Sequence, residues 1–190
     1  DRIRHVYFPI DSFVSLITPV GESGFESGLV GSEGVLGISL VLGVDISPQR
    51  GLVQGPGSAL RMPAAAFRRE LARSLPLRRV LDRYLYAVMC QLAQSGACTR
   101  FHVIEARLAR WLLMSHDRSP GDKFHLTHEF LAYMLGVRRG GITVAAGALQ
   151  KRKLITYVRG NITILDRAGL EAASCACYRI DRETYARMLP

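Results

Sequence analysis

The residues most able to do chemistry in this sequence are basic, and they gather in one segment. Between Arg138 and Arg159 there are six basic residues and no acidic residue. The chain carries a formal net charge of +9, yet its first 70 residues hold six basic and seven acidic groups. A local excess of this kind is typical of a surface that binds a polyanion, and a solvated basic face without a partner is the plainer alternative.

Catalytic chemistry has no comparable support in the sequence. There are no paired carboxylates, no nucleophile beside a base and no phosphate-cradling loop, so we do not expect an enzyme or a catalytic residue. The four cysteines form no C-x-x-C pair. We therefore expect no metal site and no cofactor, and we interpret Cys175 and Cys177 as ordinary thiols in a reducing cytosol.

The composition places the chain among globular proteins. Of its 190 residues, 48% are hydrophobic and 22% are charged, which is typical of a packed domain. No apolar run approaches the roughly 18–20 residues of a membrane span and no signal segment opens the chain, so we expect a cytoplasmic protein with no membrane partner. The chain begins with Asp1 inside a predicted strand, so we expect natural residues to be missing before it.

Residues 127–151 have the pattern of a helix-turn-helix. Thr127 is a good N-cap for a first helix, and Gly136 falls where the turn needs a left-handed backbone. Ile142 would anchor a second helix, from about 139 to 151, against the first. Arg138, Arg139 and Thr143 then face outward, where the start of a recognition helix contacts base edges or phosphates.

Two alternating apolar segments, 154–158 and 162–165, flank the polar tip Arg159-Gly160-Asn161 and predict a β-hairpin. A hairpin directly after a helix-turn-helix is a wing, and its tip would lie along a DNA backbone with Arg159 on a phosphate. The basic run 151–153 has two interpretations, DNA contact or favourable charge at a helix C-terminus.

The remaining sequence predicts the parts that position this segment. Residues 1–62 have the pattern of short strands separated by glycine turns, typical of a β-roll, with strands at about 5–8, 12–17, 51–54 and 58–62. Ser74 is expected to cap a long helix, and a shorter helix is expected at about 103–115. The long helix has one apolar stripe, interpreted both as core and as a dimer interface. Its predicted interface residues are Leu77, Leu81, Tyr84, Leu85, Val88 and Leu92.

This order of parts resembles the Crp–Fnr family of bacterial transcription regulators, most specifically over residues 107–113, 126–139 and 149–155. The resemblance implies an α+β fold: a β-roll sensor over 1–70, incomplete at its N-terminus, a dimerisation helix over 71–101 and a winged helix-turn-helix domain over 102–190. It also implies a homodimer on double-stranded DNA, with RNA polymerase as a further partner. Thr127 and His128 match the family's backbone-contacting positions, and Arg139 matches one of its base-reading positions.

The sequence also departs from the family. Cyclic-nucleotide members carry a Gly-Glu pair followed by an Arg-Ser pair. The first pair corresponds to Gly34-Val35 in this chain, and the second falls near Asp45, where there is no arginine. Arg50 could take that position only if the loop were longer. We therefore expect an effector other than a cyclic nucleotide, if the β-roll senses one. His5 and His102 are interpreted as ordinary residues and not as haem ligands. The alternative function is a small-molecule sensor that acts through protein contacts without binding DNA, with a ligand pocket under the loop 34–43.

Overall fold

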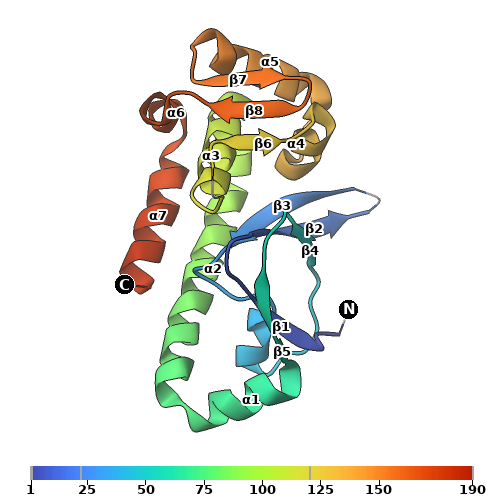
Figure 1. Ribbon diagram of the computed structural model, residues 1–190, viewed down its shortest axis with the longest axis vertical. Helices are drawn as coiled ribbons and strands as arrows, with labels where there is room; N and C mark the ends of the chain where they lie inside the picture. Colours follow the sequence, from blue (N-terminus) through green and yellow to red (C-terminus); the bar gives the residue numbers. More distant parts are fainter. Residues whose placement is uncertain (1, 22, 120, 190) are drawn as a thin grey trace.

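The computed structural model describes residues 2–21, 23–119 and 121–189. The molecule is elongated along one helix, α2 (Leu75–Phe101), with strands packed beside it and the helix-turn-helix elements at one end (Figure 1). None of the described helices is both long and apolar enough to cross a membrane. The mixed α and β composition and the order of the parts confirm the predicted fold class.

The N-terminal strands form two small antiparallel sheets. β1 (His5–Pro9) pairs with β5 (Ala59–Pro63), and β2 (Val14–Val20) lies between β3 (Ser23–Val30) and β4 (Arg50–Val53). The four strands that the sequence predicted are therefore present, at slightly shifted bounds. Residues 38–42 were predicted only as part of strands and turns, and there the prediction was wrong, because they form a short 3-10 helix, η1 (Ile38–Leu42).

Three helices follow the strands. α1 (Ala64–Arg73) ends at Ser74, whose side chain accepts a hydrogen bond from the Leu77 N–H at 3.3 Å and caps α2 as predicted. α3 (Ile104–His116) lies within one residue of its predicted bounds, and its predicted apolar face is buried at Leu108, Trp111 and Leu112.

The apolar stripe of α2 packs inside its own chain. Leu81, Tyr84 and Val88 are buried in one cluster with residues of the β-roll and α1, and Leu77 and Leu92 are partly buried against that cluster. Leu85 is half-buried. In this chain Leu81, Tyr84 and Val88 therefore serve as core, which is one of the two roles predicted for the stripe.

A second buried cluster joins the β-roll to the C-terminal half. It combines Phe13, Ile17 and Leu29 from the strands with the inward faces of α3 and the elements that follow it. The predicted β-roll and helix-turn-helix regions are thus packed on one another in the described residues, and not joined by α2 alone.

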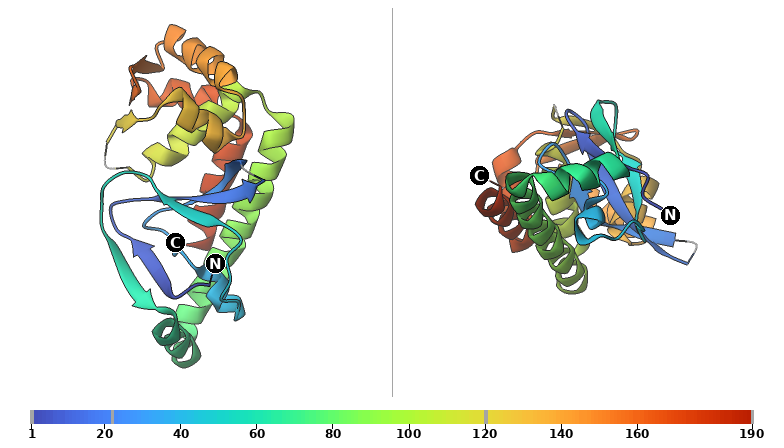
Figure 2. Two further views of the ribbon diagram at one scale, coloured as in Figure 1. Left: turned by 90° about the vertical axis from the view of Figure 1, so that its right-hand side faces the viewer. Right: turned by 90° about the horizontal axis from the view of Figure 1, so that it is seen from below.

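The last part of the chain forms two helices for which the sequence made no prediction. α6 (Arg167–Ala173) is short, and α7 (Ala176–Met188) runs alongside α2, while the strands pack against another face of that helix (Figures 1 and 2). An ion pair of 2.6 Å between Arg110 and Asp181, both largely buried, ties α7 to α3.

Glu26 lies on β3 at the junction with α3, and its carboxyl group is buried. Burial raises the pKa of Glu26 from 4.5 to about 7, although the Ser15 hydroxyl donates a hydrogen bond to it and Arg110 and Arg118 attract its charge. The folded chain therefore binds a proton that the unfolded chain releases between pH 4.5 and 7. The contribution of Glu26 to the free energy of unfolding therefore falls as the pH rises through that window and is constant above it.

We expect Glu26→Gln to stabilise the protein at pH 8, by at most about 3 kcal/mol, because glutamine cannot ionise. The gain should vanish near pH 4, where Glu26 is protonated in both states. Urea unfolding of both proteins at pH 4, 6 and 8 measures it, and Glu70→Gln on α1 reports the effect of losing one charge elsewhere. A gain of equal size at all three pH values would show that the pKa of Glu26 is the same in the folded and the unfolded chain.

Candidate nucleic-acid interface

The first helix of the helix-turn-helix is α4 (His128–Leu135). The Phe130 N–H donates to the Thr127 hydroxyl at 3.1 Å, so Thr127 is the N-cap that the sequence predicted. Gly136 ends the helix with φ 62° and ψ 45°, a left-handed conformation that a side chain would strain. The Arg107 guanidinium donates to the Leu135 carbonyl and holds this end of α4 against α3.

The second helix is α5 (Arg139–Lys151), and it is amphipathic in the predicted sense. Its inward face is buried in the shared core, whereas Thr143 and Val144 are exposed on the opposite face. Gly141 permits a close approach to α3, because a Cβ there would lie 2.6 Å from the Ile104 side chain. The inward residues of α5 are Ile142, Ala145, Ala146 and Leu149.

Arg138 and Arg139 lie at the exposed start of α5. Neither forms an ion pair with any residue that the structure describes. Two guanidinium groups at a helix N-terminus gain nothing from the helix dipole, which favours negative charge there. Within the described residues, neither an ion pair nor the helix dipole accounts for their placement.

His128 connects α4 to α5 and to the wing. Its ring stacks on Tyr157 with centroids 4.5 Å apart, and its Nδ1 hydrogen-bonds to the Thr143 hydroxyl at 3.0 Å. Burial, with a smaller effect from the charge of Arg139, lowers the pKa of His128. A neutral ring suits this position, because it packs as an aromatic group near the arginines and adds no further positive charge to the repulsion between them.

The wing is the predicted hairpin plus one strand. β7 (Ile155–Val158) and β8 (Asn161–Ile164) pair across the tip, and β6 (Lys123–His125) adds to the outer edge of β8. The three residues of β6 gave no strand signal of their own, and no prediction was made for them. Arg159 is exposed at the tip, and the Asn161 side chain is held by His125 at 3.0 Å.

One residue of the basic run 151–153 after α5 forms an ion pair within the chain. Arg152 pairs with Glu105 of α3 at 2.9 Å, whereas Lys151 and Lys153 are exposed. Arg152 thus has a partner within the chain, which favours the structural interpretation at that residue. Seven residues were predicted to contact DNA. Five of them lie on α4, on α5 or at the N-caps of these helices, and two lie on the wing. All seven are exposed except the half-buried His128.

The β-roll touches the helix-turn-helix directly. β3 packs on α4, and a Cβ on Gly136 would lie only 3.2 Å from the side chain of Phe25. A groove between the β2–β3 hairpin and α4 is also lined by Arg138 and Arg139. The strands of the β-roll therefore contact the same turn that positions the two arginines.

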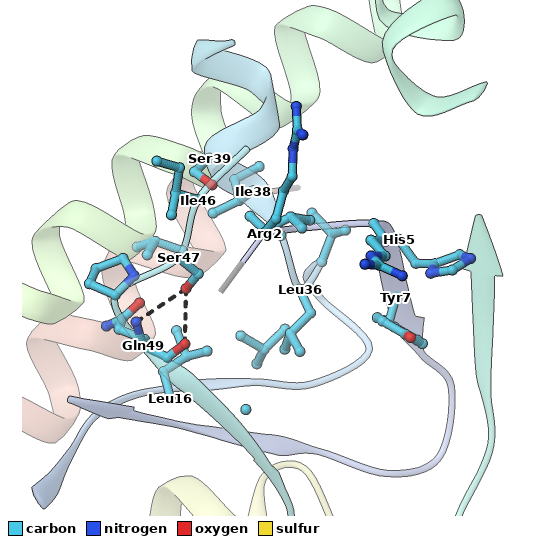
Figure 3. A pocket seen from close by; sticks show the side chains of 18 of the residues that line it. Arg2, His5, Tyr7, Leu16, Leu36, Ile38, Ser39, Ile46, Ser47 and Gln49 are labelled. Carbon is cyan, nitrogen blue, oxygen red and sulfur yellow. Dashed lines mark hydrogen bonds between the residues drawn. The ribbon is translucent and has the colours of Figure 1, made fainter. Parts of the chain in front are cut away.

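A cavity of about 450 Å³ lies in the β-roll, under the loop where the sequence placed a pocket (Figure 3). Aliphatic side chains from the strands, η1 and α2 form most of its wall, and Arg2, Arg4 and His5 contribute basic groups. Arg2 pairs with Asp45 at 2.9 Å. Among the described residues neither an acidic side chain nor Arg50 lines the cavity, so the cyclic-nucleotide pairs have no counterpart in it.

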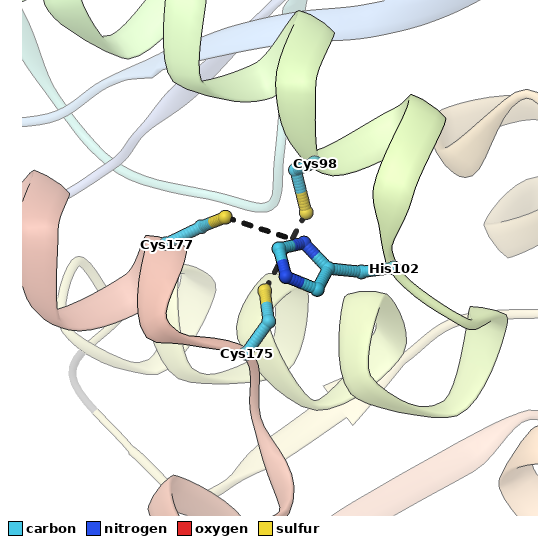
Figure 4. A group of neighbouring side chains, drawn as sticks. All are labelled: Cys98, His102, Cys175 and Cys177. Carbon is cyan, nitrogen blue, oxygen red and sulfur yellow. Dashed lines mark hydrogen bonds between the residues drawn. The ribbon is translucent and has the colours of Figure 1, made fainter.

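Sequence reasoning missed a second group of side chains, away from the basic face. Cys98 and His102 at the end of α2 meet Cys175 and Cys177 at the start of α7 (Figure 4). Two signals were available: the four-residue spacing of Cys98 and His102, which puts both on one face of a helix, and the close spacing of Cys175 and Cys177, which were interpreted as ordinary thiols. Nothing in the sequence shows that α7 returns to this face.

The comparisons with known proteins agree with this geometry. A sequence profile of the Crp-like helix-turn-helix domain matches residues 106–173, and no curated protein matches the sequence. Solved structures with a similar fold include a CRP-family regulator, TTHB099, from Thermus thermophilus, with a TM-score of 0.73 at 17% identity over 92% of this chain and 89% of that one.

FixK2 from Bradyrhizobium japonicum matches with a TM-score of 0.73 at 12% identity over 93% of this chain and 90% of that one. A second Thermus thermophilus protein, the CRP/FNR-family regulator TTHA1359, has a TM-score of 0.62 at 19% identity, with coverage of 92% and 88%. At these identities the similarity establishes a common fold over nearly the whole chain, and the profile match adds the type of its C-terminal domain.

Proposed function

Because the chain has the fold of the Crp–Fnr transcription regulators and contains their type of helix-turn-helix domain, we propose that it is a homodimeric regulator that binds DNA in a sequence-specific way. In this proposal residues 1–70 are the sensor, 71–101 the dimerisation helix and 102–190 the DNA-binding domain. The function is binding, not catalysis.

The observation that carries the proposal is the pair Arg138 and Arg139. Both are exposed and unpaired among the described residues, at the first turn of a helix whose opposite face is fully buried. A recognition helix contacts base edges with its N-terminal residues, and arginine is the commonest partner of guanine. The exposed Arg159 at the wing tip supplies a phosphate contact in the same proposal.

DNA recognition by this fold needs two copies, and one exposed face of α2 suits a contact between them. Tyr86, Met89, Ala93 and Gly96 are exposed at steps of three and four residues, the spacing of a helix–helix seam. Tyr86 and Met89 are 53% and 60% exposed, which is high for large apolar side chains. We propose this face as the dimer interface, in place of the buried stripe that the sequence predicted.

Met89→Glu should shift the protein from dimer to monomer and raise the dimer dissociation constant at least about tenfold. The reason is that the proposed interface would bring the two introduced glutamate side chains, one from each copy, close together. Sedimentation equilibrium measures the change. Val53→Glu, which adds the same charge at an exposed apolar residue of β4, is the matched control. Dimers of unchanged strength in Met89→Glu would place the interface elsewhere.

The function is tested by selecting bound duplexes from random sequence and then measuring how the binding constant of the selected duplex depends on salt concentration. We expect one enriched, near-palindromic sequence, a binding constant that falls with salt, and at least about a thousandfold preference over random duplex. Binding no stronger than to random duplex would reject the proposal and favour a sensor that acts through protein contacts.

The cavity in the β-roll favours an effector that is largely apolar and carries an acidic group, because its wall is largely aliphatic and it is also lined by Arg4, which has no ion pair among the described residues. We propose this chemical class in place of a cyclic nucleotide. Repeating the duplex selection with a small-molecule extract tests for an effector through a change in affinity.

A further inference from the structure

Four metal-binding side chains converge where α2 ends and α7 begins. Their ligand atoms, three thiol sulfurs and one imidazole nitrogen, all lie within 4.8 Å of one another. The Sγ atoms of Cys98 and Cys175 are 3.5 Å apart, and the Cys177 Sγ lies 3.5 Å from the His102 Nδ1 (Figure 4). The three cysteines are buried and His102 is half-buried, so this group is an internal one.

The fold builds this group from two short segments. Cys98 lies in the last turn of α2, and His102, four residues later, is the residue at which α2 ends. Cys175 is the N-cap of α7, and Cys177 lies in its first turn. Since α7 packs along α2, the two pairs face each other at the junction between α2 and α3.

We propose that Cys98, His102, Cys175 and Cys177 bind a single Zn²⁺ ion in a tetrahedral structural site. Three cysteines and one histidine are one of the common ligand sets of structural zinc, and soft thiolate ligands select this ion over Mg²⁺ or Ca²⁺. All four ligands come from the protein, so no position is left open for water or substrate. The site therefore fastens α7 to the end of α2 and has no catalytic role.

The distances favour one ion over a larger cofactor. Zn²⁺ binds sulfur at about 2.3 Å and imidazole nitrogen at about 2.0 Å, so ligand atoms of a tetrahedral site lie roughly 3.5–3.8 Å apart. Two of the separations are already 3.5 Å. An iron–sulfur cluster places several iron and sulfide atoms between its ligands and needs a wider opening than 4.8 Å.

Neighbouring groups supply the support that such a site needs. Gln94 donates from its Nε2 to the Cys177 Sγ at 2.9 Å. The guanidinium groups of Arg107 and Arg110 lie close enough to attract negative charge at Cys98 and Cys175. Zn²⁺ with three thiolates and a neutral histidine has a net charge of −1, which these arginines offset.

The first test is the metal content of the full chain, purified under reducing conditions without chelator. We expect one zinc per chain by elemental mass spectrometry. Replacement by Co²⁺ should give the visible absorption of a tetrahedral thiolate site. Iron with sulfide, no retained metal, or a Cys98–Cys175 disulfide in place of metal would each overturn the proposal.

Variants separate this site from other effects. Cys175→Ser and His102→Ala should each weaken zinc binding more than about a hundredfold, and Gln94→Ala about tenfold, because it removes only a supporting hydrogen bond. Cys90→Ser is the matched control, since Cys90 lies on α2 outside the group. A Cys90→Ser protein that loses zinc, or a Cys175→Ser protein that keeps it, would contradict the assignment.

Chelation gives a readout that does not depend on DNA. Removing zinc from the unmodified chain should lower its thermal midpoint by more than about 5 °C, and re-adding zinc should restore it. If Cys175→Ser does not fold, this reversible shift and the Co²⁺ spectrum of the unmodified chain still decide the question. A midpoint that chelator leaves unchanged would show that no ion fastens α7.

Discussion

Replacing both Arg138 and Arg139 with alanine is expected to weaken binding to the selected duplex about a hundredfold or more. Each arginine that reaches a guanine edge contributes about 1–3 kcal/mol of discrimination, and a factor of ten corresponds to about 1.4 kcal/mol. Neither side chain stabilises the fold through an ion pair among the described residues, so thermal stability should change little. Because a contact to a base edge discriminates between sequences, the loss of affinity should be much smaller on a random duplex.

The matched control is Arg68→Ala with Arg69→Ala. These two arginines are also adjacent and exposed on a helix, but α1 lies at the opposite end of α2 from the helix-turn-helix (Figure 1). Fluorescence anisotropy on one specific and one random duplex separates the effects. If both double variants lose the same small amount of affinity, the basic face acts only through net charge and does not read sequence.

Ile142→Ala is expected to lower the free energy of unfolding by about 2–5 kcal/mol, the range for removing a large aliphatic side chain from a core. Ile142 is fully buried where α5 meets α3 and α4, and it belongs to the cluster that also includes strands of the β-roll. The cavity would therefore open at the centre of the domain and not at its edge. Urea denaturation followed by circular dichroism measures the loss.

Val144→Ala tests whether position in the packing, and not helix propensity, causes that loss. Val144 is two residues away on the same helix and is 75% exposed, and alanine is also the better helix former. We expect unchanged or slightly higher stability in this variant. Equal losses at both positions would mean that Ile142 is not the anchor of the second helix.

The sequence was most informative where geometry is local. The bounds of α5, the Thr127 cap and the left-handed Gly136 followed from residue types at fixed spacing, because a two-helix turn permits few solutions. Ser74 and α2 were predicted for the same reason. The basic face followed from composition, because α5 and the wing are consecutive in the chain.

Other features depend on contacts between distant segments, which a single sequence does not encode as a local pattern. The stripe through Leu81, Tyr84 and Val88 could face the β-roll or a second copy, and only packing shows that it faces the β-roll. The meeting of Cys98 with Cys175 needs the return of α7, for which no prediction was made. The strand β6 is too short for alternation to be visible and exists because β8 offers it an edge.

The contact between Phe25 and the Gly136 turn bears on how a signal would travel through this protein. In the proposed regulator, a displacement of β3 by a ligand in the β-roll cavity, which Val30 of the same strand lines, would reach α4 directly through this packed contact. The path through the whole length of the central helix is then a second, parallel route. In the proposed regulator, a variant that interrupts this direct contact would leave the route along α2 in operation.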